Sequence, residues 1–325
     1  MMHRERFTLY GNRKYMRKKK WTVDDIPQQG GKIAVVTGAN SGLGFNTTRA
    51  LANKGARVIM ACRNLEKGEM ARQRIINEGV AVEPELCPLN LASLASVKEF
   101  ALKYTAAHEK LDLLINNAGL MAIPYDRTED GFEMQFGVNH LGHFALTAIL
   151  WPVLSATKGS RVIQVSSLAH LIGEIRFDDI NWEKGYKKWG AYGMSKLANL
   201  LFVRELANRV TETGSGVTVA AAHPGYADTE LQAKSAKMEG KQLGAKAMNL
   251  INKVLAQSGE KGALPSLYAA TADGVEQGAY FGPGGVLKMQ GWPVADSPSK
   301  KLVTNEVAAQ LWKVSEALTS MEFRV

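Results

Sequence analysis

The sequence predicts a single-domain α/β protein with a doubly wound parallel sheet of about seven strands. From Lys32 onward, short apolar runs alternate with helix-length amphipathic segments. This alternation is typical of a parallel sheet that helices cover on both faces. No linker-like Pro- or Ser-rich break divides the 325 residues, so the chain favours one domain over two.

Seven apolar runs qualify as strands, because each is short and is bounded by turn residues. They are residues 33–37, 57–61, 82–87, 113–116, 161–166, 217–222 and 279–281. The segments between them have helical periodicity, seen as an apolar stripe from Leu94 to Tyr104. Longer helices are predicted for residues 131–150, 191–209 and 298–318.

Two long segments, residues 168–190 and 226–257, interrupt this rhythm. Both follow the carboxyl ends of predicted strands, where open α/β sheets bind ligands, so we expect substrate loops. Within the second loop, apolar residues recur at helical spacing between Lys246 and Lys253. This pattern favours a lid over the substrate, with a membrane-surface helix as the alternative.

Positive charge is concentrated in residues 1–20, which supply +7 of the formal net charge of +9 through eight Lys or Arg and one Glu. The rest of the chain is nearly neutral, which argues against a nucleic-acid function. We expect a basic, disordered extension at residues 1–20, with an early start codon ahead of Met16 as one variant, and a catalytic domain at residues 21–325. Peripheral contact of the extension with an anionic membrane surface is the alternative.

No run approaches the ~20 apolar residues of a transmembrane segment. Cys62 and Cys87 lie at the ends of two predicted strands, which favours reduced thiols and a cytoplasmic location. His140 and His143 lack an acidic partner at ligand spacing, so no metal site is predicted and packing explains both rings.

A glycine-rich turn follows the first predicted strand. Gly38, Gly42 and Gly44 lack side chains and so let backbone N–H groups approach a pyrophosphate at the positive end of a helix. The run Asn-Asn-Ala-Gly at residues 116–119 closes the fourth strand. These features predict a dinucleotide site, with an ordinary tight turn as the alternative.

The end of the second strand indicates which dinucleotide is bound. Sites that prefer NAD usually place an acid here to accept from the ribose hydroxyls. This chain has Met60-Ala-Cys-Arg-Asn64, which contains no acid. Arg63 can pair with a 2′-phosphate, so NADP is predicted, and a surface arginine without this role is the alternative.

The most informative stretch is Tyr192-Gly-Met-Ser-Lys196. The four-residue spacing places a phenol and an ammonium on one helix face. A tyrosine is a poor acid or base at neutral pH, and a nearby cation lowers its pKa by favouring the phenolate. Reduction of a carbonyl needs a proton on the oxygen, and Tyr192 is placed to donate it.

With the glycine-rich turn, the run at residues 116–119 and the pair Ser166-Ser167, this stretch resembles the short-chain dehydrogenase/reductase family, which has a Rossmann-type fold. The resemblance extends from about Trp21 onward. Residues 61–64, 138–144 and 192–199 are most similar to the retinol-dehydrogenase-like branch. The resemblance implies a catalytic set of Asn139, Ser167, Tyr192 and Lys196.

Each implied catalytic residue has a physical role. Ser167 would orient the substrate oxygen and stabilise developing charge, with Ser166 as the alternative hydroxyl. Lys196 would also hold the nicotinamide ribose, and Asn139 would position a water that links Lys196 to solvent. The predicted cofactor-binding residues are Gly38, Asn40, Ser41, Gly42, Leu43, Gly44, Arg63, Asn90, Leu91, Asn117, Ala118, Gly119, Tyr192, Lys196, Pro224, Gly225 and Thr229.

Asn90 departs from the family pattern, because relatives commonly have an acid there that contacts the adenine amino group. Its side-chain carbonyl is the acceptor that is left. This difference affects the expected affinity for the cofactor and not the chemistry.

Together these features predict an NADP-dependent oxidoreductase that interconverts an alcohol and a carbonyl. Apolar pocket candidates favour a lipophilic small-molecule substrate, and retinoid-like substrates are implied only by the branch resemblance. An NADP-sensing or scaffold protein without turnover is the alternative, and light-driven reduction of a tetrapyrrole double bond is a third. Long helices in this family often build homo-oligomers. The pocket candidates are Leu120, Met121, Leu168, Leu171, Met194, Tyr226 and Leu231.

Overall fold

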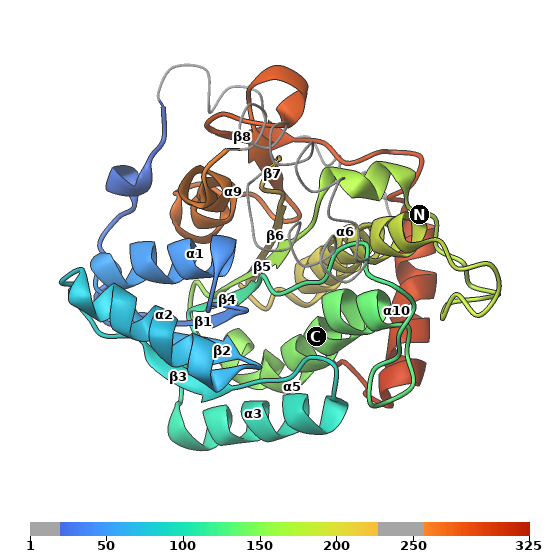
Figure 1. Cartoon of the computed structure of the whole chain (residues 1–325), viewed down its shortest axis with the longest axis horizontal. Coiled ribbons are helices and arrows are strands. Elements are labelled where there is room, and N and C mark those ends of the chain that lie inside the picture. Colours follow the sequence, from blue (N-terminus) through green and yellow to red (C-terminus); the bar gives the residue numbers. More distant parts are fainter. Residues whose placement is uncertain (1–19, 227–256) are drawn as a thin grey trace, which may run out of the picture.

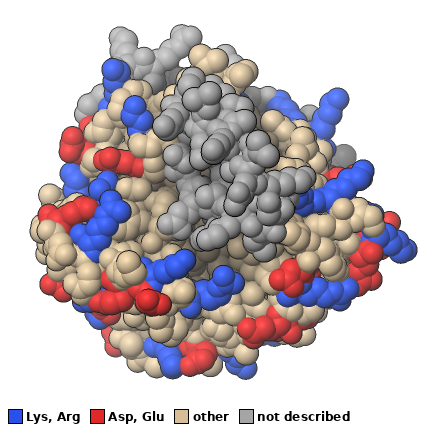
Figure 2. Space-filling view, viewed as in Figure 1, with Lys and Arg blue, Asp and Glu red and all other residues tan. Residues whose placement is uncertain are grey.

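The computed structural model describes residues 20–226 and 257–325. Most of the basic extension and nearly all of the predicted lid, with Thr229 and Leu231, therefore lie outside the described residues. None of the helices in the described ranges is both long and apolar enough to span a membrane. Acidic and basic side chains are interspersed on the face shown in Figure 2.

Eight strands form one sheet in the order β3-β2-β1-β4-β5-β6-β7-β8 (Figure 1). The first seven run parallel, and β8 pairs with β7 in the antiparallel direction. The predicted doubly wound sheet is confirmed. The strands are β1 (Ile33–Thr37), β2 (Arg57–Cys62), β3 (Glu85–Pro88), β4 (Leu113–Asn116), β5 (Arg161–Val165), β6 (Thr218–Ala222), β7 (Tyr280–Pro283) and β8 (Pro293–Asp296).

The sequence analysis missed β8. This strand begins with a proline, ends with an aspartate and has only one buried residue, Pro293. It therefore has neither an apolar run nor a regular alternation, and its place in the sheet depends on pairing with β7 at the edge.

Helices cover both faces of the sheet, and alternate residues of β1 point into two separate cores. Val35 packs in the core beneath α3, α5, α6 and α10, whereas Val36 packs in the core beneath α1, α2 and α9. Figure 1 shows α1 and α9 above the strands and α3 and α5 below them. The helices are α1 (Gly42–Asn53), α2 (Leu65–Asn77), α3 (Leu94–Ala107), α5 (Gly142–Ala156), α6 (Lys188–Thr213), α9 (Gly259–Thr271) and α10 (Asn305–Thr319).

Five short helical segments complete the described elements: η1 (Val23–Asp25), α4 (Met134–Phe136), η2 (Gly137–Leu141), η3 (Leu168–Ile172) and η4 (Val286–Lys288). The helix predicted over residues 131–150 is wrong in one respect, because α4 and α5 are separated by the π-helical turn η2. A π-helical turn inserts one extra residue and often marks a functional site. The residue at its centre is Asn139.

The chain order of the strands sets the position of the site. Strands β2 and β3 lie on one side of β1, and the chain then crosses to the other side, where β4 and the later strands follow in order. Ligands bind outside the carboxyl ends of the strands at such a switch point. The turns after β1 and β4 are therefore neighbours, and Val36 pairs with Ile115 just before them.

The C-terminal segment completes the core beneath α5 and α6. The ring of Phe323 lies 4.8 Å from Trp312, 5.4 Å from Trp151 and 5.6 Å from Phe144, measured between centroids. Aromatic pairs at this spacing stabilise a core beyond the area they bury. The helix in this segment begins at Asn305 and not at residue 298 as predicted.

We expect Phe323→Ala to lower the free energy of unfolding by about 3–5 kcal/mol, because it removes a buried ring and leaves a cavity. Phe323 is 2% exposed. Leu102→Ala is the control, since Leu102 lies on α3 and is 52% exposed, and its effect should stay within about 0.5 kcal/mol. Urea unfolding measures both, and equal effects would contradict the placement of Phe323 in the core.

Candidate active site

The predicted dinucleotide turn is built by backbone conformation at the end of β1. Gly38 and Gly42 have φ values of +65° and +54°, which favour glycine. A Cβ on Gly44 would lie 2.3 Å from the carbonyl oxygen of Gly38, so no other residue fits there without a shift of the backbone. The turn therefore requires these three glycines.

The amino end of α1 has the properties of an anion site. Ser41 is the N-cap residue, but its side chain makes no capping hydrogen bond. The N–H groups of the first turn thus have no acceptor in the Ser41 side chain, and they form the positive end of the helix. A pyrophosphate fits this arrangement. Asn40, Ser41 and Leu43 are half-buried around it.

The adjacent turn after β4 is fixed to β1 through Thr37. The Thr37 hydroxyl accepts hydrogen bonds from the backbone N–H groups of Asn117 and Ala118, both at 2.9 Å. The Asn117 side-chain amide donates to the Thr37 carbonyl at 2.7 Å. These bonds hold the predicted cofactor residues 117–119 beside the glycine-rich turn.

On the adenosine side, Arg63 lies exposed after β2, and no acid lies between β2 and the N-cap residue of α2, Asn64. A 2′-phosphate at this strand end could therefore pair with the Arg63 guanidinium, and the acid that follows most closely in the sequence is Glu66 in the first turn of α2. Leu91, also predicted to contact the cofactor, is 7% exposed.

The Asn90 side chain is held in one orientation. Its oxygen accepts from the backbone N–H of Ala92 at 3.2 Å, and its amide donates to Glu129 at 3.0 Å. One lone pair of the expected acceptor is thus already used. Glu129 therefore brings a carboxylate next to Asn90, at the strand end where relatives commonly have an acid. The sequence does not predict this contact, because the two residues are 39 positions apart and no local pattern links them.

Tyr192 and Lys196 lie on α6, and both are buried, at 6% and 4% exposure. The Lys196 ammonium lies 5.9 Å from the centroid of the Tyr192 ring and donates to the carbonyl oxygen of Val165 at 3.2 Å. A hydrogen bond joins the side chains of Tyr192 and Ser167. The end of β5 therefore meets the helix at the predicted catalytic groups.

The two serines after β5 have different partners. The Ser166 hydroxyl is buried and donates to the backbone carbonyl of Lys196 at 2.8 Å, so it holds α6 in place. Ser167 begins η3, where its oxygen accepts from Ala169 N–H at 3.2 Å. Of the two, Ser167 is the one in contact with Tyr192, which favours it as the catalytic hydroxyl.

Burial sets the pKa values in this site. It raises the pKa of Tyr192, and the hydrogen bond from Ser167 opposes this rise. It lowers the pKa of Lys196 to about 8. From the sequence, Lys196 is expected to lower the pKa of Tyr192. In the structure the effect of burial is larger, because the phenolate would lose its hydration, and the pKa of Tyr192 is raised.

Asn139 joins the π-helical turn to the end of β4. Its amide oxygen accepts from the Leu120 N–H at 2.7 Å, and its amide nitrogen donates to the Leu120 carbonyl at 2.9 Å and to the Ser195 hydroxyl at 2.8 Å. A Cβ on Gly119 would lie 3.1 Å from Oδ1 of Asn139 and 3.3 Å from Nζ of Lys196. The absence of a side chain at Gly119 thus lets both groups approach this strand end.

The turn after β6 is also rigidly held. Gly225 has a φ of +66°, and the carbonyl of Pro224 accepts from the Gln257 side chain at 2.6 Å. Just before it, His223 bonds through Nε2 to Asp296 on β8 at 2.9 Å. The edge strand that the sequence analysis missed therefore supports a predicted cofactor turn.

The first predicted substrate loop, residues 168–190, is anchored beside the site. The Tyr186 hydroxyl donates to the carbonyl of Ile123 at 2.9 Å, and Gln135 donates to that hydroxyl at 2.9 Å and to the carbonyl of Lys188 at 3.0 Å. This network fixes the loop to the segment after β4.

The pocket candidates separate into two groups. Met194 is fully buried in the core beneath α6, so its assignment to the pocket was wrong. The assignment failed because α6 is buried on most of its surface and not on one face only. Leu171 is 57% exposed, and Leu120, Met121, Leu168 and Tyr226 are intermediate. These five are at least partly exposed and stay candidates for substrate contact.

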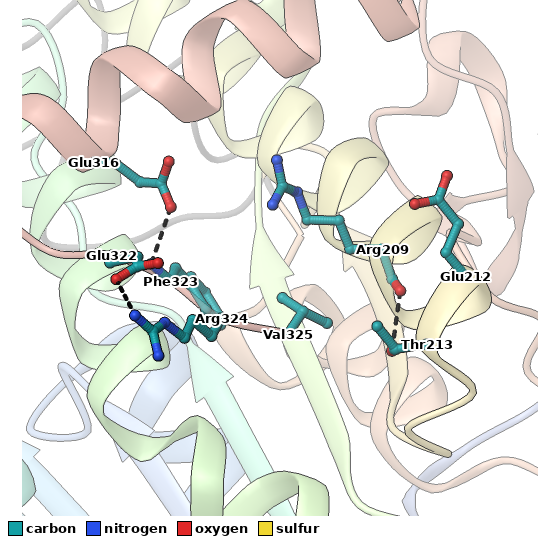
Figure 3. A pocket seen from close by; sticks show the side chains of 8 residues that line it. All are labelled: Arg209, Glu212, Thr213, Glu316, Glu322, Phe323, Arg324 and Val325. Atoms are coloured by element: carbon teal, nitrogen blue, oxygen red, sulfur yellow. Dashed lines mark hydrogen bonds and ion pairs between the residues drawn. The ribbon is translucent and has the colours of Figure 1, made fainter.

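A separate hollow of about 490 Å³ lies at the far ends of α6 and α10 (Figure 3). Arg209 lies in it 17 residues after Tyr192 on the same helix, which corresponds to about 25 Å. The hollow contains none of the predicted site residues. Its lining is Arg209, Glu212, Thr213, Glu316, Glu322, Phe323, Arg324 and Val325.

The thiols do not have the properties of reactive groups. Burial raises the pKa of Cys62 to about 11 and also raises the pKa of Cys87. Within residues 20–226 and 257–325, no three His, Cys, Asp or Glu side chains gather as a metal site requires.

Comparison with known proteins identifies the family, since residues 32–240 match the short chain dehydrogenase family. The chain belongs to that family. It is 44% identical to retinol dehydrogenase 13 of Homo sapiens over 295 residues, which is 90% of this chain and 86% of that protein. It is 42% identical to retinol dehydrogenase 12 of Mus musculus, over 90% of this chain and 88% of that protein.

A crystal structure of a protein from Mycobacterium paratuberculosis has the same fold. It is 41% identical, superposes with a TM-score of 0.78, and the match covers 94% of this chain and all of the other. The predicted resemblance to the retinol-dehydrogenase-like branch is confirmed. This short-chain dehydrogenase is therefore an oxidoreductase with a nucleotide-binding Rossmann fold.

We expect Lys196→Met to raise the free energy of unfolding at pH 7 by about 2–3 kcal/mol, because it removes a buried ammonium whose pKa falls from 10.5 to about 8. At pH 7 the lysine is protonated in the folded and the unfolded chain, so the full penalty is present. Between pH 8 and 10.5 the folded protein loses the proton first, and the penalty fades.

The carbonyl of Val165 keeps a donor in this variant, since the Asn199 side chain also bonds to it at 3.0 Å. Lys103→Met is the control, because this lysine on α3 is 70% exposed. Urea unfolding at pH 7 and pH 10 measures the effect. A loss of stability at pH 7 would show that Lys196 stabilises the fold.

Proposed function

We propose that this protein is an NADP-dependent oxidoreductase that interconverts a lipophilic alcohol and its carbonyl, with Tyr192 as the group that donates or accepts the proton. The observation that carries this proposal is the burial of Tyr192 and Lys196 together on α6, beside Ser167 and next to Gly119 at the turn after β4. These groups meet at the switch point where open α/β sheets bind ligands.

The chemistry divides between cofactor and protein. A bound nicotinamide supplies or accepts the hydride. Ser167 donates a hydrogen bond to the substrate oxygen and stabilises the charge that develops there. Tyr192 gives its proton to that oxygen in reduction and takes it back in alcohol oxidation. Lys196 places a positive charge beside the phenol and would hold the nicotinamide ribose of a bound cofactor.

The protonated state of Tyr192 is the state that reduction needs. Because burial raises the pKa of Tyr192, the phenol keeps its proton and can act as an acid. Oxidation of an alcohol needs the phenolate, whose population grows with rising pH. Asn139 has a positioning role in this proposal, at the place where a water would connect Lys196 to solvent.

The choice of NADP rests on Arg63. This guanidinium is exposed at the carboxyl end of β2, where an acid would repel a 2′-phosphate and none is present. The remaining cofactor contacts are those predicted at the turns after β1, β3, β4 and β6.

A lipophilic substrate is supported by the apolar residues at the mouth of the site and by the names of the relatives, which are retinol dehydrogenases. A cytoplasmic location, a homo-oligomeric state and contact of the basic extension with a membrane surface stay predictions.

The alternative is an NADP-sensing or scaffold protein without turnover. Such a protein binds the dinucleotide but transfers no proton, so it has no use for the buried phenol of Tyr192 beside Ser167 and Lys196. The presence of these three groups together supports an enzyme.

We expect Tyr192→Phe to lower kcat by about 10²–10⁴-fold, because it removes the proton donor and leaves the ring in place. The Kd for NADPH should change little. Tyr104→Phe is the matched control: the Tyr104 hydroxyl is also bonded, to the Lys110 carbonyl at 2.7 Å, but Tyr104 lies in the last turn of α3, and Lys110 precedes the amino end of β4. NADPH oxidation with a series of aldehydes and ketones is the measurement, and wild-type turnover in Tyr192→Phe would reject the assignment.

Arg63→Ala should reduce the preference for NADPH over NADH by about 10- to 100-fold, as expected for the loss of a charge-assisted pair of ~1.5–3 kcal/mol. Arg74→Ala removes another exposed arginine, from the far end of α2, and should leave the preference unchanged. The ratio of kcat/KM for the two cofactors is the readout. Equal ratios in wild type and Arg63→Ala would exclude this role.

A further inference from the structure

We propose that His143 is a positioning residue that couples the dinucleotide-binding turn to the catalytic π-helical turn. It lies outside the set of Asn139, Ser167, Tyr192 and Lys196, and on sequence grounds packing alone explained it. The inference rests on the proposed function, since it assigns His143 a part in that same site.

His143 is in the first turn of α5, four residues after Asn139, and it is 1% exposed. Its Nδ1 lies 3.1 Å from the backbone oxygen of Asn139. Its Nε2 lies 2.9 Å from the hydroxyl oxygen of Thr37. One buried ring thus touches the end of β1 and the centre of η2.

The partners of the ring select one tautomer. A backbone carbonyl only accepts, so Nδ1 must carry the proton that goes to Asn139. Burial lowers the pKa of His143 to about 4, so the ring is neutral at physiological pH and Nε2 has a free lone pair. Nε2 therefore accepts from the Thr37 hydroxyl.

The hydrogen bonds of Thr37 confirm this direction. Its oxygen already accepts the N–H groups of Asn117 and Ala118, which use both lone pairs. Its single proton can go to Nε2 of His143 at 2.9 Å or to the Ile115 carbonyl at 3.4 Å, and the shorter bond is the stronger. Each polar atom in the bridge then has a complementary partner.

The bridge joins two clamps on one stretch of backbone. Thr37 fixes the amides of Asn117 and Ala118, and Asn139 fixes both polar groups of Leu120. Gly119 lies between these clamps, beside the Lys196 ammonium. A shift of the cofactor turn would therefore move Asn139 by two routes, through the hydrogen bonds of His143 and through the backbone of residues 117–120.

The neighbouring histidine shows what a purely structural role looks like. His140 bonds through Nε2 to the Ser315 hydroxyl on α10 at 2.8 Å, and its ring packs against Phe136 at 5.1 Å. These contacts join η2 to the C-terminal helix and include no residue of the cofactor turn.

Two amide substitutions separate the two ends of the bridge. An asparagine carries its amide where the Nδ1 of histidine lies, so His143→Asn keeps a donor for the Asn139 carbonyl and loses the contact with Thr37. A glutamine reaches the place of Nε2, so His143→Gln keeps an acceptor for Thr37 and loses the contact with Asn139.

We expect His143→Asn to raise the Kd for NADPH about tenfold while kcat at saturating NADPH falls less than about threefold, since one hydrogen bond at the cofactor side is lost. His143→Gln should show the reverse, with kcat reduced about tenfold and Kd changed less than about threefold. Energy transfer from tryptophan to bound NADPH measures Kd without turnover, and NADPH oxidation measures kcat.

Thr37→Val removes the same contact together with the bonds that Thr37 accepts from Asn117 and Ala118, so it should raise Kd more than His143→Asn does. Thr157→Val is the matched control, because this buried hydroxyl joins the other end of α5 to the Leu111 N–H at 3.0 Å before β4. It should lower the free energy of unfolding and leave Kd and kcat within about twofold.

A merely structural role for His143 would raise Kd and lower kcat together in both His143 variants, in proportion to the loss of stability, and this result would overturn the proposal. If wild-type protein binds NADPH but reduces no carbonyl, the proposed function fails, and the Kd values still test the bridge to Thr37. If one His143 variant does not fold, the other still tests its own end of the bridge, because each amide substitution keeps one contact and removes the other.

Discussion

The hydroxyl of Thr37 is the contact on which the rest of the site depends. It joins the ends of β1 and β4 by accepting two backbone N–H groups at the point where the sheet reverses direction. The glycine-rich turn, the Asn-Asn-Ala-Gly run and the π-helical turn are all arranged around this oxygen. A buried hydroxyl with its bonding capacity filled is rigid, and this rigidity lets backbone groups recognise a dinucleotide without rearrangement.

On α6, burial has a different effect, because it changes the pKa values of two side chains. Tyr192 and Lys196 are held in surroundings that disfavour their charged forms, so burial raises the pKa of the phenol and lowers the pKa of the ammonium to about 8. Such an arrangement is unfavourable to the folded state and requires a well-packed frame. The two cores on either side of the sheet and the aromatic cluster around Trp312 supply that frame.

Much of this architecture could be predicted from the sequence, because the strands of a buried parallel sheet are continuous apolar runs and the binding turns need particular residues at fixed spacings. What could not be predicted depends on distant contacts. The edge strand β8 has no apolar run, the π-helical turn is stabilised by bonds from Asn139 to Leu120, and Glu129 meets Asn90 only in the folded chain. The spacing of Tyr192 and Lys196 predicts that the two groups are close but not that they are buried. The predicted direction of the Tyr192 pKa shift was therefore wrong.

The C-terminal segment has a consequence for biosynthesis. Trp312 and Phe323 fill the core beneath α5, and Ser315 bonds to the histidine next to Asn139, yet all three follow every strand of the sheet in the chain. During translation the sheet and its binding turns emerge from the ribosome first, while the apolar surface of α5 still lacks its cover. The nascent chain must therefore protect that surface, by a chaperone or by transient contacts, until the last helix has been synthesised.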